Sequence, residues 1–162
     1  KTAEQHAVDI GIVDEVVSYN DKRKQSMAGR VIAALDGAVP GKVIAILGLA
    51  FKPETDDMRD SPSVDIVRDL ASAGAQIKAY DPKAMDEARH MLPEDVSYCD
   101  SASDCIADAD AVVIVTEWNE FRAMTAAHFI AAMRGNVLVD LRNIYDVAQM
   151  REAGLSYTSI GR

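Results

Sequence analysis

Positive charge, cysteine and long apolar runs are all scarce in this sequence. Its 17 Lys and Arg residues face 26 Asp and Glu residues, which leaves a formal net charge of −9 at pH 7. A surface with this balance repels the phosphates of nucleic acids and of anionic membranes. We therefore expect neither nucleic acid nor a membrane as a partner.

No apolar run approaches the roughly 20 residues that a membrane-spanning helix needs. The first eleven residues, KTAEQHAVDIG, lack the basic flank and apolar centre of a secretory signal. These two absences together favour a cytoplasmic chain.

The two cysteines, Cys99 and Cys105, have no second cysteine pair and no histidine beside them. Their spacing fits neither a zinc site nor a disulfide framework, so we interpret both as small residues of the core. The three histidines, at positions 6, 90 and 128, have no acid or thiol at the spacing of a catalytic triad and receive no role.

The 162 residues, 49% of them hydrophobic, are enough for one well-buried core. Residues 1–37 predict a long helix, either continuous or broken near Gly11, with apolar side chains at helical spacing. These apolar residues are Val13, Val16, Val17, Met27, Val31 and Leu35. Gly37, Pro40 and Gly41 then mark a boundary, and a folded domain is expected over residues 42–162.

Strand-like and helix-like segments alternate along that domain. The expected strands cover residues 43–47, 76–80, 96–98, 111–115 and 137–140, and a last one ends at Ile160. The expected helices cover residues 62–73, 83–91 and 125–133, with a short one before the final strand. Short apolar strands alternating with helices predict an α/β fold with a Rossmann-like, doubly wound parallel sheet.

Two serine or aspartate residues stand directly before prolines where helices are expected to begin. Ser61 precedes Pro62 and Asp81 precedes Pro82, which predicts a capping side chain followed by proline in the first helical turn. Asp81 also resembles the ribose-binding acid of dinucleotide-binding folds, but it lies far beyond the usual distance from the first glycine. We therefore interpret Asp81 as a helix cap.

Ligands of open α/β sheets bind at the carboxyl ends of the strands, and the first such end carries an unusually long connection. This connection, GLAFKPETDDMRDSP, has only the first of the three glycines of a dinucleotide fingerprint. Lys52 and Arg59 are residue types that hold phosphates. The alternative is a solvated loop whose bases pair with its own acids, and adjacent Asp56 and Asp57 are disfavoured as metal ligands because neighbouring side chains diverge.

Four segments together carry a family resemblance. GLAFKPETDDMRDSPS at 48–63, AYDP at 79–82, VIVTEWNEF at 113–121 and DLRNIYD at 140–146 resemble the C-terminal part of the UDP-glucose 6-dehydrogenase family. The polar stretch YNDKRK at 19–24 is similar to part of that family's central helix. TEWNEF resembles the UDP-glucose branch more than the GDP-mannose branch.

The resemblance implies a division of labour among the candidate residues. Phe51 and Lys52 would contact the UDP-sugar, and Arg142 would lie near the UDP, although the match there allows a one-residue slip toward Asn143. Arg59 would reach NAD bound by another domain. Trp118 either stacks on a ligand base or covers the core, and a tryptophan after a buried strand favours the core.

The resemblance also implies a three-part enzyme, with an NAD-binding domain, a central helix that forms a homodimer and a domain that closes over UDP-glucose. By the same resemblance, the whole enzyme would oxidise the sugar C6 alcohol to a carboxylate in two NAD-dependent steps through a cysteine-bound intermediate. The family's NAD fingerprint and its Ser-Cys-Phe-Pro nucleophile motif do not occur in this sequence. We therefore expect a piece of a longer enzyme, inactive alone, with no catalytic residue and no metal ligand of its own.

Two alternatives remain open at this point. One is a dehydrogenase for another nucleotide sugar, UDP-ManNAc or GDP-mannose. The other is a noncatalytic α/β module that binds a nucleotide or a protein.

Overall fold

The computed structural model describes residues 11–161, so the part of the predicted first helix before Gly11 lies outside the described residues. The helices are α2 (Gly11–Ala34), α3 (Pro62–Ser72), α4 (Met85–Met91), α5 (Ala102–Ile106), α6 (Asn119–Arg122), α7 (Ala126–Ala132) and α8 (Val147–Glu152). The strands are β1 (Val43–Leu47), β2 (Gln76–Tyr80), β3 (Ser97–Tyr98), β4 (Ala111–Ile114), β5 (Val137–Asp140) and β6 (Ser156–Ser159).

The six strands form one parallel sheet in the order β3-β2-β1-β4-β5-β6. This order confirms the predicted doubly wound sheet, because it runs outward in both directions from β1 and β4. The direction of winding reverses between these two strands, and a ligand crevice is expected at their carboxyl ends. The connections after β1 and β4 therefore decide what the sheet can bind.

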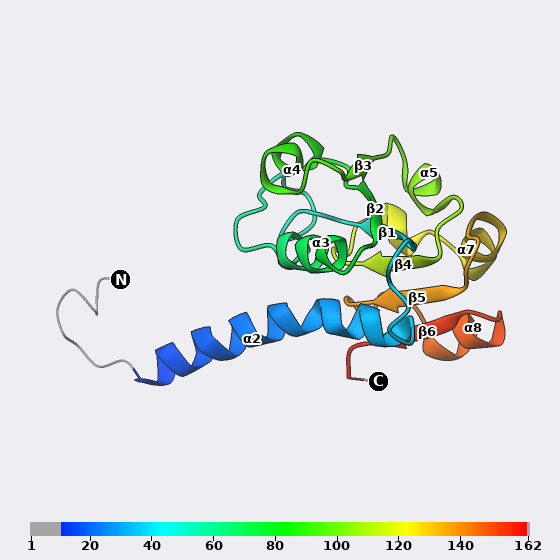
Figure 1. Ribbon diagram of the computed structural model, residues 1–162. Helices are drawn as coiled ribbons and strands as arrows, with labels where there is room; N and C mark the ends of the chain where they lie inside the picture. The colour runs from blue at the N-terminus through cyan, green and yellow to red at the C-terminus, as the bar shows by residue number, and fades with distance from the viewer. Residues whose placement is uncertain (1–10, 162) are drawn as a thin grey trace.

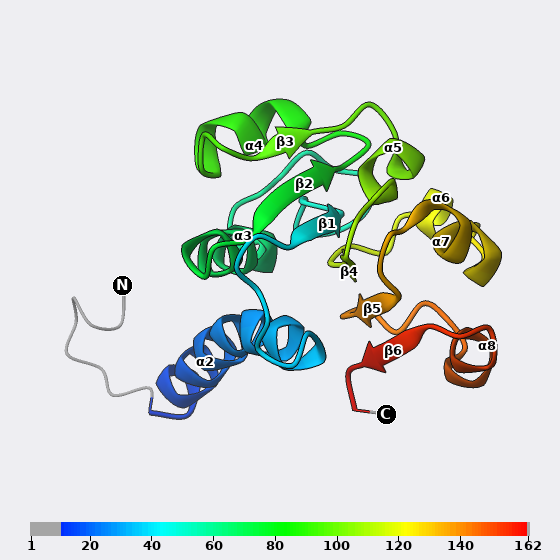
Figure 2. The same cartoon turned by 45° about the vertical axis from the view of Figure 1, so that its right-hand side comes forward.

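The central strands are apolar because they are buried on both faces. Ile44 and Ile46 of β1 face one core and Ala45 and Leu47 face the other, and all four side chains are fully buried. Helices α2, α3 and α4 cover the first face, whereas α5, α7 and α8 cover the second (Figure 1 and Figure 2). Each strand thus contributes alternate residues to two separate cores.

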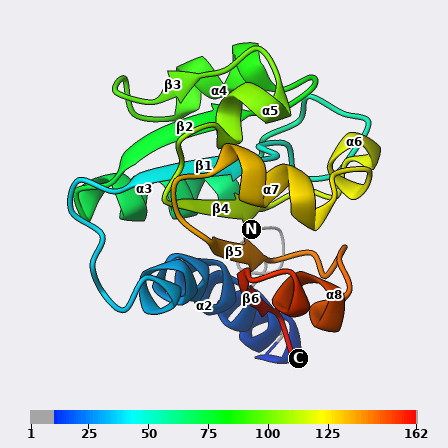
Figure 3. The ribbon, with the colours of Figure 1, turned by 90° about the vertical axis from the view of Figure 1, so that its right-hand side faces the viewer.

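Helix α2 has two halves with different surroundings. Met27, Ala28 and Val31 in its second half are buried in the core that β1 shares. The first half extends beyond the sheet in Figure 1, whereas Figure 3 looks nearly along the helix, and this half carries large exposed apolar side chains. These are Ile12, Val13, Val16, Val17 and Tyr19. The apolar residues at helical spacing therefore serve two surroundings, because Met27 and Val31 belong to the domain core while those of the first half are exposed.

The two predicted proline-adjacent caps have different outcomes. Ser61 is the N-cap of α3, where its hydroxyl accepts from the amide of Ser63 and Pro62 occupies the first turn, as predicted. Asp81 is not the cap of α4, because that helix begins only at Met85 and its N-cap, Ala84, has no side-chain cap bond. The Asp81 carboxylate has other partners, described below.

The structure also contains two helices that the sequence pattern did not predict, α5 and α6, of five and four residues. Segments of this length are too short to show a helical repeat of apolar residues. Within residues 11–161, no helix is long and apolar enough to cross a membrane.

Candidate functional site

The connection after β1 begins with a glycine that the neighbouring strand requires. Gly48 has φ of +91°, and a Cβ atom there would lie 2.5 Å from Cβ of Thr116, which follows β4. A side chain would meet both backbone strain and a clash. Gly48 thus lets the β1 connection pass directly against the β4 connection at the switch point.

The carboxylate of Asp81 fixes the next two residues of this connection. One of its oxygens accepts hydrogen bonds from the amides of Leu49 at 2.7 Å and Ala50 at 3.0 Å, and from the indole of Trp118 at 3.1 Å. The other accepts from the amides of Lys83 and Ala84, both at 2.9 Å. A fully buried carboxylate therefore ties together the connections that follow β1, β2 and β4.

This arrangement decides whether the domain can bind a dinucleotide in the usual Rossmann manner. In that mode the amides of the turn after the first strand hold the pyrophosphate. Here the amides of Leu49 and Ala50 already bind the Asp81 carboxylate, so an internal anion stands where the pyrophosphate would. The turn after β1 consequently does not fit the pyrophosphate of NAD.

The long connection folds back on itself before α3 begins. The amide of Phe51 donates to the carbonyl of Asp57 at 2.8 Å, which closes a small outward loop. The hydroxyls of Ser61 and Ser63 donate to the carbonyl of Leu49 at 2.7 and 2.6 Å, and the Thr116 hydroxyl donates to that of Ala50 at 2.6 Å. These buried bonds fix both ends of the loop and leave its tip exposed.

The acids of the loop bind bases, but not Lys52. Asp57 forms two hydrogen bonds with the Arg59 guanidinium, at 2.9 and 2.8 Å, and these bonds lower the pKa of Asp57 to about 2. The other two ion pairs join Asp60 to Lys24 of α2, at 3.8 Å, and Glu54 to Lys83, at 3.1 Å. Among the described residues, Lys52 has no ion-pair partner within 4.0 Å.

A second buried carboxylate shapes the connection after β5. Asp140 accepts hydrogen bonds from the amides of Arg142, Ile144 and Tyr145, at 2.9, 2.7 and 3.1 Å, and from the hydroxyl of Tyr157 at 2.7 Å. These bonds fold residues 141–145 over the end of the strand. They set the position from which the Arg142 side chain extends.

The Arg142 side chain is oriented by an acid from the β4 connection. Its Nε atom donates to Oε2 of Glu117, and this hydrogen bond lowers the pKa of Glu117 below its ordinary value. Because Nε carries this bond, the two terminal amino groups of the guanidinium stay available to a ligand. Trp118, the next residue, is 4% exposed and belongs to the core, as the sequence favoured.

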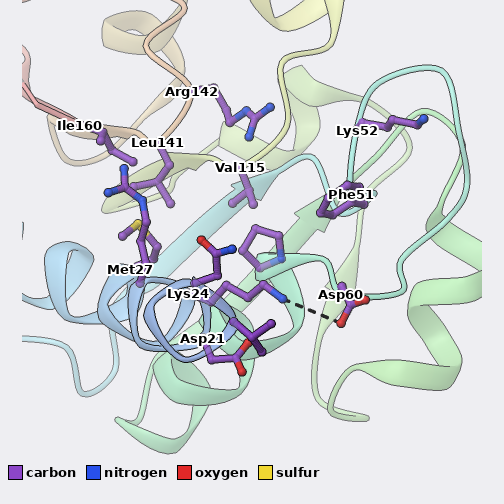
Figure 4. Close-up of a pocket in the computed structure, with 14 residues that line it drawn as sticks. Asp21, Lys24, Met27, Phe51, Lys52, Asp60, Val115, Leu141, Arg142 and Ile160 are labelled. Carbon is purple, nitrogen blue, oxygen red and sulfur yellow. Dashed lines mark ion pairs between the residues drawn. The ribbon is translucent and has the colours of Figure 1, made fainter. Parts of the chain in front are cut away.

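A cavity of about 680 Å³ lies between residues 17–27 in the middle of α2 and the carboxyl ends of β1, β4 and β5 (Figure 4). It brings together Phe51, Lys52 and Arg142, three of the four candidate residues. Arg59 is not among the residues that line it. Phe51 is unusual for an aromatic side chain in being half exposed, and in Figure 4 the Lys52 side chain extends away from those of α2.

Helix α2 supplies part of the cavity wall that sequence reasoning did not assign. Four polar residues line it from this helix: Asn20, Asp21, Arg23 and Lys24. The polar stretch at 19–24, which interrupts the apolar spacing of the helix, was the available signal. No cluster of three or more His, Cys, Asp or Glu residues that could hold a metal occurs in residues 11–161.

The fold is a Rossmann-like α/β domain without a glycine-rich turn, and its cavity is lined in part by residues of the β1 and β5 connections. Residues 45–147 match the family model described as the UDP-glucose/GDP-mannose dehydrogenase family, UDP binding domain. The chain therefore belongs to that family.

Similar proteins agree with this assignment. The UDP-glucose 6-dehydrogenase of Rhizobium meliloti (strain 1021) is 46% identical over 162 residues, which are 100% of this chain and 37% of the relative. A UDP-glucose 6-dehydrogenase of Bacillus subtilis (strain 168) is 37% identical over 154 residues, or 95% of this chain and 35% of the relative. The chain thus spans little more than a third of the length of these curated relatives.

Solved structures share the fold. The UDP-D-ManNAc dehydrogenase from Pyrococcus horikoshii superposes with a TM-score of 0.81 at 28% identity, covering 99% of this chain and 36% of that protein. The UDP-glucose dehydrogenase from Pyrobaculum islandicum gives a TM-score of 0.74 at 29% identity, covering 96% and 33%.

Proposed function

We propose that this chain is the nucleotide-sugar-binding part of an NAD-dependent UDP-glucose 6-dehydrogenase, which converts UDP-glucose to UDP-glucuronate. The observation that carries the proposal is the cavity that joins Phe51, Lys52 and Arg142. It supplies an exposed aromatic ring for a base or sugar, and two cations for a diphosphate. The names of the relatives in Rhizobium and Bacillus support UDP-glucose as the sugar nucleotide.

The charges of the site favour an anionic ligand in spite of the acidic chain. Within residues 11–161 Lys52 has no ion-pair partner, and Glu117 binds Arg142 at Nε, away from the terminal amino groups. Arg23 and Lys24 add two further cations from α2, although Lys24 also lies 3.8 Å from Asp60. A diphosphate therefore meets bases from three separate segments of the chain.

The oxidation itself needs groups that the cavity does not contain. Neither Cys99 nor Cys105 lines it, so this chain offers no thiol to a bound sugar. NAD would supply the hydride acceptor, and the turn after β1 does not fit its pyrophosphate. We therefore propose that NAD is bound by another domain of the whole enzyme, that Arg59 reaches it from this one, and that this chain alone does not oxidise UDP-glucose.

The remaining partners follow from the same proposal. The exposed apolar residues of α2 would form a homodimer interface, since such patches on a protruding element mark contact surfaces. The division into a helix segment, residues 1–37, and a UDP-sugar-binding domain, residues 42–162, stays a prediction. So does the cytoplasmic location.

The direct test is calorimetric titration of this chain with UDP. We expect one saturable site, which Arg142→Ala weakens roughly ten- to a hundredfold through loss of charge-assisted hydrogen bonds. Arg59→Ala is the matched control, because Arg59 does not line the cavity, and it should leave UDP affinity unchanged.

Competition with other nucleotides separates the alternatives. UDP-glucose should displace UDP more strongly than UDP-ManNAc or GDP-mannose does. Stronger displacement by either of these two would assign the site to a different sugar nucleotide. Absence of any saturable UDP binding would overturn the proposal and leave the GDP-mannose enzyme and the noncatalytic module.

A further inference from the structure

The side chain of Glu117 extends from a turn that is fixed on both sides. The amide of Trp118 donates to the carbonyl of Thr116 at 3.1 Å, which is the hydrogen bond of a γ-turn centred on Glu117. Both neighbours are buried, and their side chains donate in turn to the carbonyl of Ala50 and to the carboxylate of Asp81. The backbone of Glu117 is therefore held by the bonds of the residues before and after it.

The backbone of Arg142 is held in a similar way. Its amide donates to the carboxylate of Asp140 at 2.9 Å. The next residue, Asn143, has φ of +57°, in the left-handed region that asparagine adopts more readily than most residues. The Asn143 side chain donates to the carbonyl of Ile160 and accepts from its amide, both at 3.0 Å. Arg142 thus lies between anchored residues, and only its side chain remains to be oriented.

The hydrogen bond that orients this side chain differs from the other arginine–carboxylate pairs of residues 11–161. Arg59 and Arg134 each donate to their acid from Nε and from a terminal amino group, the two-bond geometry typical of arginine. Arg142 donates from Nε alone, and neither of its terminal amino groups has a hydrogen-bond partner in the described part of the chain. Arg142 lines the cavity (Figure 4), so its outer nitrogens are left for a ligand.

Glu117 influences the cavity through Arg142, because it is not itself among the residues that line it. The exposed fraction is 24% for the Glu117 side chain and 36% for that of Arg142, so water and salt screen the pair less than a fully exposed one. The hydrogen bond from Arg142 is also the main cause that lowers the pKa of Glu117. The carboxylate is therefore ionised, and bound to Nε, at neutral pH.

We propose that Glu117 is a positioning residue for the sugar nucleotide: by binding Nε of Arg142, it holds both terminal amino groups toward the diphosphate. This inference rests on the proposed function. An arginine side chain that is free in the empty site loses its freedom on binding, which costs roughly two- to tenfold in affinity. With Glu117 in place, the side chain is ordered before the ligand arrives.

The test is calorimetric titration of variants with UDP, and its sign separates positioning from charge repulsion. Charge alone predicts that removal of an acid near the site strengthens anion binding. Positioning predicts that Glu117→Ala weakens UDP binding roughly two- to tenfold. Glu117→Gln keeps an oxygen that accepts from Nε, so it should bind UDP at least as tightly as the wild type. Glu120→Ala, at an exposed position of α6, is the matched control and should change the affinity less than about twofold.

A double-mutant cycle shows whether the effect passes through the arginine. In an Arg142→Ala background, Glu117→Ala should no longer weaken UDP binding, because no guanidinium remains to be positioned. The proposal is overturned if Glu117→Ala leaves UDP affinity unchanged or raises it when Arg142 is present. Equal losses in the two backgrounds, or an equal loss with Glu117→Gln, would show a structural role and would overturn it as well.

A measurement without ligand covers the case in which a variant fails to fold. In NMR spectra of the wild-type chain, the Nε proton of Arg142 should exchange with water more slowly than that of Arg30, an exposed residue of α2. Equally fast exchange would overturn the proposal. A protected proton in a chain that binds no UDP would overturn the proposed function, and with it the role of Glu117. UDP binding that tolerates Glu117→Ala would overturn the role of Glu117 alone.

Discussion

The indole nitrogen of Trp118 donates a hydrogen bond of 3.1 Å to the carboxylate of Asp81, across the switch point of the sheet. The same carboxylate holds the amides of Leu49 and Ala50, directly before Phe51 and Lys52. The loop that carries Phe51 and Lys52 is therefore held in position by residues that follow β2 and β4. Asp81 replaces, within the protein, the anion that a glycine-rich turn would bind.

The first prediction concerns Asp81→Asn, which keeps the volume of the side chain but turns an amide NH2 group toward hydrogen-bond donors. Because five donors converge on the carboxylate, we expect the free energy of unfolding to fall by about 2 to 4 kcal/mol. Urea unfolding measures this loss. Asp69→Asn, at an exposed position on α3, is the control and should change stability by less than about 0.5 kcal/mol. Equal effects of the two variants would contradict the role of Asp81.

The sequence predicted the parallel sheet correctly, but it did not predict the hydrogen-bond partners of Asp81. Strand and helix alternation after Lys42 fixed the winding, and the winding placed Lys52 and Arg142 at one edge because both follow parallel strands. The amides of Leu49 and Ala50, which bind Asp81, lie more than 30 residues away from it, and no local sequence pattern indicates such a partner.

A second prediction follows from the lowered pKa of Asp57. A carboxylate whose pKa is depressed in the folded state stabilises that state above its unfolded pKa of about 3.9, and the stabilisation is lost as the pH falls through about 2. Carbon NMR titration of the Asp57 carboxyl should therefore give a midpoint near 2. Arg59→Ala should return it to the ordinary range, since the guanidinium hydrogen bonds are the main cause. A midpoint near 4 in the wild type would mean that the pair does not persist in solution.

The third prediction concerns association through α2. We expect the chain to form a dimer in light scattering, and Val16→Glu to convert it to a monomer, because a charge would be buried in the apolar contact. Ile130→Glu on α7 is a matched control, since Ile130 is 46% exposed and Val16 is 53% exposed. Dissociation by both substitutions, or a monomeric wild type, would refute an interface at this position.

The last prediction separates Lys52 from Arg59 in the full-length enzyme. Lys52 lines the cavity and has no acidic partner among the described residues, so Lys52→Ala should weaken UDP-glucose binding and leave NAD binding nearly unchanged. Arg59 is exposed outside the cavity and is held by Asp57, so Arg59→Ala should weaken NAD binding and spare UDP-glucose. Each loss should be roughly ten- to a hundredfold, the value of one charge-assisted hydrogen bond.

Calorimetric titration of both variants with both ligands gives the four affinities that decide this division. Asp57→Asn serves as the control for the loop, because it releases the Arg59 guanidinium without removing either base. If the loop only needed its charges to fold, all three variants would lose both ligands to a similar degree. If the division holds, Asp57→Asn alters NAD affinity alone, since it frees the arginine while Lys52 keeps its place at the cavity wall.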